Sequence, residues 1–144
     1  MKLTFKGGIH PYEGKELTMD KDVIEYVPKG DMVYPLSQHI GAPAKAVVKK
    51  GDRVLVGQLI AEAGGFVSAN IHSSVSGTVK AVEPRLTASG SKVNSIVIEN
   101  DNQFEEIEYV KNEKPLAELT KEEILEAIKN AGVAMPAFIG ATYF

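Results

Sequence analysis

Residues 50–63 read KGDRVLVGQLIAEA and residues 71–79 read IHSSVSGTV, and these two stretches decide the fold. In the first stretch a Gly-Asp pair can form a tight turn, and a later glycine turns the chain into the apolar run LIA. In the second stretch a glycine separates two short runs of β-branched residues. Apolar runs of this length, bounded by glycine turns, are typical of short antiparallel strands.

The same pattern extends outward on both sides, through about the first hundred residues. Valine, isoleucine and alanine dominate the apolar runs, and glycine, proline, aspartate or serine separates them roughly every 8 to 14 residues, the spacing of an all-β sandwich or barrel. The predicted strands cover residues 33–36, 46–49, 58–62, 66–71, 77–82 and 95–99. We therefore expect a mainly β fold, with two small sheets packed on a Val/Ile/Ala core.

A helix is predicted near the C-terminal end of the sequence. Thr120 followed by Glu123 fits a capping box, in which each side chain satisfies a free backbone amide. Ile124, Leu125 and Ile128 recur at helical spacing, and Gly132 is placed to end the helix. We expect three segments: a β domain over 1–104, an acidic linker over 105–119, and residues 120–144 as the helix and the start of a second domain.

Composition excludes several classes of function. The 144 residues are 44% hydrophobic and 24% charged, as in ordinary globular proteins. No apolar run approaches the roughly 20 residues that span a bilayer, and no signal peptide is visible, so neither membrane insertion nor export is expected. A net charge of −3 with dispersed basic residues makes nucleic acid an unexpected partner. The absence of cysteine excludes thiolate-bound metals, iron–sulfur clusters and disulfides.

Residues 47–82 resemble the flattened barrel of biotinyl and lipoyl carrier domains, because the Gly-Asp-x-Val-x-x-Gly-Gln and Val-Ser-Gly-Thr-Val motifs occur at the family's separation. The resemblance implies a barrel-sandwich hybrid fold. The carriers present a modified lysine where this sequence has Phe66, which has no amine to form the amide. Lys80, the nearest lysine, falls within a predicted strand rather than at a hairpin tip. A carrier function is therefore disfavoured.

Five longer phrases resemble the N-terminal region of the RnfC subunit of the Rnf electron-transport complex, in the family's order. They are FKGGIHP (residues 5–11), PLSQHIGAPA (35–44), EAGGFVSA (62–69), IHSSVSGTV (71–79) and SIVIEND (95–101). The resemblance implies a peripheral subunit on the cytoplasmic side of the cell membrane. Its complex would couple electron transfer between NADH and ferredoxin to ion translocation, and its partners would be the other subunits.

The family implies FMN, NADH and two [4Fe-4S] clusters for the whole subunit, but no cofactor is expected in this chain. The clusters need cysteine quartets, and this sequence has no cysteine. The family's flavin domain begins with a glycine-rich loop, whereas residues 134–144 read AMPAFIGATYF and lack its paired glycines. We expect a truncated piece of the subunit, with a flavin-binding redox fragment as the alternative to an assembly domain.

No catalytic residues are predicted, and two loops are candidate interfaces. The first is Gln38, His39, Ile40 and Gly41; the second is Gly64, Gly65 and Phe66. The Gly-Gly pair is expected to form a tight hairpin turn with positive φ angles rather than a phosphate cradle. An exposed Phe66 could anchor a partner, but we expect it to be buried and to close the end of the barrel.

Three histidines could be drawn together as a metal site, and a run of serines could supply a nucleophile. His10, His39 and His72 are separated by about 30 residues each, which fits no compact ligand motif, so a role in holding the backbone is favoured. The serines beside His72 lack an orienting carboxylate in the motif. The predicted role is therefore a non-catalytic assembly domain, although whether the chain has enzymatic activity stays open.

Overall fold

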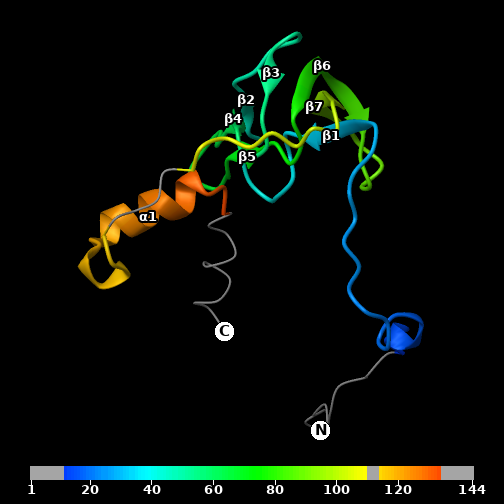
Figure 1. Ribbon diagram of the computed structural model, residues 1–144, viewed down its shortest axis with the longest axis horizontal. Coiled ribbons are helices and arrows are strands. Elements are labelled where there is room, and N and C mark those ends of the chain that lie inside the picture. Colours follow the sequence, from blue (N-terminus) through cyan, green and yellow to red (C-terminus); the bar gives the residue numbers. More distant parts are fainter. Residues whose placement is uncertain (1–11, 110–113, 134–144) are drawn as a thin grey trace, which may run out of the picture.

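The computed structural model describes residues 12–109 and 114–133 (Figure 1). The strands are β1 (Asp31–Pro35), β2 (Lys45–Ala46), β3 (Arg53–Val54), β4 (Leu59–Glu62), β5 (Ile71–His72), β6 (Gly77–Leu86) and β7 (Lys92–Asn100). Two 3₁₀ turns, η1 (Lys15–Leu17) and η2 (Leu116–Glu118), and one helix, α1 (Lys121–Asn130), complete the described elements. The prediction of a mainly β fold with a short C-terminal helix is confirmed.

The strands form two antiparallel sheets. One sheet has four strands in the order β1-β7-β6-β3, and the other has three in the order β2-β4-β5. The long hairpin of β6 and β7 forms the centre of the larger sheet, and the register between these two strands shifts between Val79 and Ala81. Such an irregularity bends a strand and increases its twist, which curls this sheet around the core.

A single apolar core lies between the sheets. The larger sheet contributes Val54, Val79, Ile96 and Ile98, and the smaller one contributes Ile60, Ala61 and Ile71. All of these side chains are buried, and Val54, Ile60, Ile96 and Ile98 are fully so. The stretches 50–63 and 71–79 therefore each supply buried apolar side chains to one core from both sheets.

The predicted strand over residues 66–71 is wrong for most of its length, since only Ile71 and its neighbour are in a strand. The preceding residues form a loop whose backbone groups are satisfied locally. The Ala63 amide donates to the Asn70 side chain at 2.9 Å, and the Gly64 amide donates to the Ser68 hydroxyl at 2.9 Å. Short polar side chains that accept backbone amides in this way compete with a strand ladder.

Helix α1 has the predicted boundaries and caps. The Thr120 hydroxyl accepts the Glu123 amide at 3.2 Å, and the Glu123 carboxylate accepts the Thr120 amide at 2.8 Å. At the other end Gly132 has a φ of 73°. Its amide donates to the Lys129 carbonyl and the Val133 amide to the Ile128 carbonyl, the pair of bonds that defines a Schellman cap.

The segment after β7 is attached to the barrel. The Val56 amide donates to the Glu105 carbonyl at 2.8 Å and the Ile107 amide donates to the Val56 carbonyl at 3.0 Å. Arg53 adds ion pairs to Asp101 and Glu105, at 2.8 and 2.6 Å. The predicted domain boundaries at residues 104 and 119 stay a prediction. Within the described ranges no helix is long and apolar enough to cross a membrane.

Candidate interface at the loop end of the barrel

The two predicted interface loops lie together. The Ala42 amide donates to the Val67 carbonyl at 2.9 Å, which joins the loop between β1 and β2 to the loop between β4 and β5. A Cβ atom on Gly64 would lie 1.9 Å from the Pro43 carbonyl oxygen, so the two backbones are in direct contact there. We call this combined surface, residues 37–43 and 63–70, the loop surface.

His39 is a fixed part of this surface. The Ala69 amide donates to Nε2 of His39 at 3.0 Å, and Nδ1 lies 3.0 Å from the Ile40 carbonyl oxygen. An amide can only donate and a carbonyl can only accept, so these two contacts fit the tautomer that carries its proton on Nδ1. The favoured interpretation of this histidine, as a group that holds the backbone, is confirmed. The half-buried imidazole ties one loop to the other.

The glycines of the loop surface allow close packing. The positive φ angle is at Gly41, at 106°, and neither Gly64 nor Gly65 has one, so the expected hairpin turn is wrong. A Cβ on Gly41 would lie 2.2 Å from the Val67 carbonyl oxygen. At Gly41 and Gly64 the absence of a side chain therefore lets two backbones approach each other, and no phosphate is needed to explain the glycines.

Phe66 is 91% exposed, so the prediction that it is buried at the end of the barrel is wrong. The hydrogen bond from the Gly64 amide to the buried Ser68 side chain closes a bend over the residues between them. Phe66 lies in that bend, while Ser68 and Ala69 turn inward and are buried. The small residues Ser68 and Ala69 are therefore inside the fold, and the aromatic ring of Phe66 is left in solvent.

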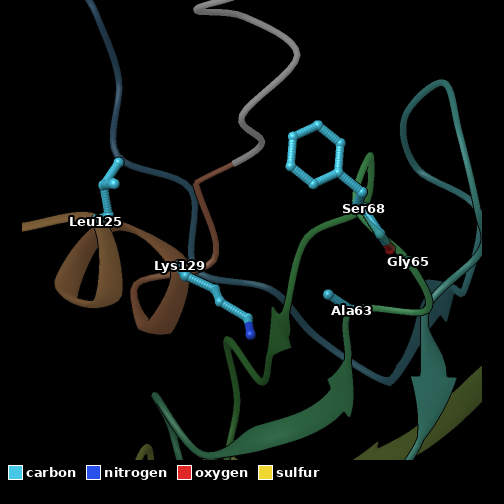
Figure 2. A pocket seen from close by; sticks show the side chains of 6 residues that line it. Ala63, Gly65, Ser68, Leu125 and Lys129 are labelled. Atoms are coloured by element: carbon cyan, nitrogen blue, oxygen red, sulfur yellow. The ribbon is translucent and has the colours of Figure 1, made fainter. Parts of the chain in front are cut away.

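A cleft of about 240 Å³ separates the Phe66 loop from helix α1. Its lining consists of Ala63, Gly65, Phe66, Ser68, Leu125 and Lys129. Figure 2 shows the Lys129 side chain extending from the helix toward Ala63, and Leu125 one turn earlier on α1. Neither Leu125 nor Lys129 was among the predicted site residues, because the sequence pattern places the helix but not the surface that it faces.

The loop between β1 and β2 adds two exposed side chains to the loop surface. Gln38 and Ile40 are exposed, Ile40 to 79%, and the Gln38 amide group donates to the Pro35 carbonyl at 3.0 Å. The loop surface therefore combines large apolar side chains in water with a backbone held by several hydrogen bonds. An apolar anchor on a preorganised loop is the usual chemistry of protein recognition.

A metal site at the histidines and a nucleophile among the serines were the two disfavoured alternatives for this region. No group of three or more histidine, aspartate or glutamate residues in the described ranges could hold a metal ion, and His10 lies outside those ranges. The Ser73 hydroxyl donates to the Val75 carbonyl at 2.6 Å and the Ser76 hydroxyl to Asp101 at 2.6 Å. These hydroxyls hold turns of the barrel in place.

Asp101 is the charged centre of that structural network. The Ser76 hydroxyl, the Gln103 amide and the Arg53 guanidinium, in this order, lower the pKa of the Asp101 carboxyl. All three favour the ionised carboxylate by donating hydrogen bonds or by charge. The network joins β3, the residue just before β6 and the segment after β7. No sequence motif links Asp101 to Ser76, 25 residues earlier, so this pairing was missed.

Two small antiparallel sheets on one core, with the Gly-Asp and Ser-Gly turns at their joints, define a barrel-sandwich module. In the described residues the loop between β4 and β5 carries Phe66 in place of a carrier lysine, and Lys80 lies in β6, paired with Asp31 at 2.8 Å. The chain belongs to the family of the RnfC barrel sandwich hybrid domain, whose model matches residues 3–103.

Three curated relatives agree with this assignment. The C subunit of the Na⁺-translocating ferredoxin:NAD⁺ oxidoreductase complex of Acetobacterium woodii is 44% identical over 141 residues, which is 97% of this chain and 31% of the relative. The C subunit of the proton-translocating complex of Clostridium ljungdahlii is 42% identical over 99% of this chain and 31% of its own length. The C subunit of an ion-translocating oxidoreductase complex of Vibrio cholerae is 38% identical over 90% of this chain and 17% of its own length.

The chain thus contains the N-terminal barrel-sandwich domain of the RnfC family, and it spans less than a third of the length of these relatives. The iron–sulfur clusters that the resemblance implies do not fit this sequence, because it contains no cysteine. The segment compared with the flavin loop, residues 134–144, lies outside the described residues.

Proposed function

We propose that this domain is a non-catalytic assembly module, which holds the electron-input part of an RnfC subunit against a neighbouring subunit through the loop surface. The observation that carries the proposal is the exposure of Phe66, at 91%, on a loop whose backbone is fixed by Ser68, His39 and Asn70. Burying such a ring gains about 1.5–3 kcal/mol, and the fixed loop has little conformational entropy left to lose on binding.

The wider setting of the proposal comes from the relatives. Their names describe subunits of ion-translocating ferredoxin:NAD⁺ oxidoreductase complexes. The resemblance to the RnfC family further implies that the whole subunit would lie at the cytoplasmic face of the membrane and use FMN, NADH and two [4Fe-4S] clusters held by other parts of its polypeptide. The residues of this domain would provide position rather than chemistry.

The proposal is tested with the full-length subunit in its complex. Phe66→Ala should weaken retention of the subunit on a complex purified through a tag on another subunit, by about thirtyfold if Phe66 is a hot spot of about 2 kcal/mol. The matched control is Leu86→Ala, which truncates another exposed apolar residue, 71% exposed, on β6. Equal retention of the Phe66 variant, the control and the unaltered subunit would refute the assembly role of the loop surface.

A further inference from the structure

Residues 12–27 precede β1 and form an arm that extends from the barrel. This arm is not part of the loop surface. Figure 1 shows the arm running away from the two sheets, with η1 near its far end. Its large apolar side chains are all at least half exposed, and Val23 is fully so. They are Tyr12, Leu17, Met19, Val23, Ile24, Tyr26 and Val27.

The composition of the arm differs from that of a solvated linker. Flexible linkers are rich in glycine, serine and charged residues, whereas residues 23–27 read VIEYV. β-Branched and aromatic residues in an extended segment are suited to a half-buried β surface. In the described part of the chain, residues 22–27 make no backbone hydrogen bond. Both the side chains and the backbone are therefore available for a partner.

The base of the arm is fixed to the barrel. The Asn100 side chain, buried at the end of β7, donates to the Pro28 carbonyl at 3.0 Å. At the start of β1, Asp31 pairs with Lys80 at 2.8 Å. The point at which the arm leaves the sheets is thus set by the fold.

The family comparison indicates what covers the arm. The family model begins at residue 3, so the arm is part of the unit that the family shares, and yet this unit does not bury it. In the first two relatives the matched stretch is 31% of the polypeptide. The rest of such a subunit is tethered to this domain, and a tether of this kind supplies effective concentrations in the millimolar range. A separate subunit or a second copy must reach the arm at a much lower concentration.

We propose that residues 12–27 are a strap that packs on the polypeptide following this domain in the full-length subunit. The strap binds through Val23, Ile24, Tyr26 and Val27 and through the backbone of the same residues, in the manner of an added strand. The proposal rests on membership in the RnfC family and is independent of the loop surface.

The test is hydrogen–deuterium exchange on the full-length subunit, purified without its partner subunits and verified as a single copy by light scattering. The amides of residues 22–27 should exchange on the order of 100-fold more slowly than unprotected amides of the same sequence. The double variant Val23→Asp/Ile24→Asp should remove this protection. The matched control Leu86→Asp places a new charge at an exposed apolar residue outside the arm and should leave the protection intact.

Three outcomes would overturn the strap. Unprotected exchange in the lone subunit and in the complex would show a solvated arm. Protection that arises only in the assembled complex would assign the arm to another subunit, and protection that is lost on dilution of a dimer would assign it to a second copy. Phe66→Ala separates this proposal from the assembly role, because it should reduce retention on the complex while the arm stays protected.

Discussion

At Gly64 a single hydrogen atom in place of a side chain determines how the two interface loops meet. The backbone there is not in the left-handed region, so steric contact rather than φ explains the glycine. A Cβ would lie 1.9 Å from the Pro43 carbonyl oxygen, a backbone atom that cannot rotate away. At the adjacent Gly65 the nearest atom would be the Ala42 methyl carbon at 3.1 Å, a milder overlap that a shift of a few tenths of an ångström relieves.

Gly64→Ala should therefore lower the free energy of unfolding by about 1–3 kcal/mol, the usual cost of an added methyl group in a packed site. Gly65→Ala is the matched control and should cost less than about 1 kcal/mol. Urea denaturation of both variants measures the difference. If the two substitutions had equal effects, the contact between Gly64 and Pro43 would not constrain the loop surface.

At the scale of the element, helix α1 depends on its ends. It has ten residues, none of which is buried, and helices of this length are marginal without packing or caps. The hydrogen bond from Lys114, at 2.5 Å, and the bond from the Thr120 amide lower the pKa of Glu123 from 4.5 to about 2. Both stabilise the ionised carboxylate at the start of the helix, where the helix dipole also favours negative charge.

The contribution of Glu123 to the helix should be fully present above pH 4.5 and be lost as the pH falls toward 2, because a carboxyl whose pKa is lower in the folded state binds its proton more readily once unfolded. Backbone chemical shifts of residues 121–130, followed from neutral pH down toward pH 2, measure helix content. Glu123→Gln should remove this pH dependence, and Glu122→Gln should retain it. A helix whose shifts do not change in this range would contradict a stabilising role for the ionised cap.

At the scale of the whole molecule, stability comes from the core shared by the two sheets. Ile98 is fully buried in the middle of β7, which pairs with β1 on one side and β6 on the other. Val33 on the adjacent β1 is 42% exposed. The same class of substitution at these two residues should therefore have very different consequences.

Ile98→Ala should reduce the free energy of unfolding by about 2–5 kcal/mol, from lost burial and from the cavity left behind. Val33→Ala, the control at a partly exposed position, should cost less than about 1 kcal/mol. Thermal and urea unfolding followed by circular dichroism measure both. A small effect of Ile98→Ala would mean that the sheets do not share one cooperative core.

Much of this architecture could be predicted from the sequence because it depends on local patterns. The strands around Ile60 and Val79 follow from apolar runs bounded by glycine turns, and both caps of α1 follow from Thr120, Glu123 and Gly132, whereas the two-residue strand β3 at Val54 was not among the predicted strands. The strand predicted over residues 66–71 was wrong because Ser68 and Asn70 accept backbone amides. Local apolar patterning does not report that competition.

The candidate site divides in the same way. By itself, the sequence determined the barrel-sandwich fold, the RnfC resemblance, the absence of a carrier lysine at Phe66 and the candidate loops. Only the tertiary structure decided that the loops form one surface joined through His39 and Ala69, that Phe66 is outside the core, and that Leu125 and Lys129 face it across a cleft. The physical reason is the distance along the sequence over which each feature is determined. Strands, turns and caps depend on neighbouring residues, whereas exposure and contact between residues some 30 positions apart depend on how the whole chain packs.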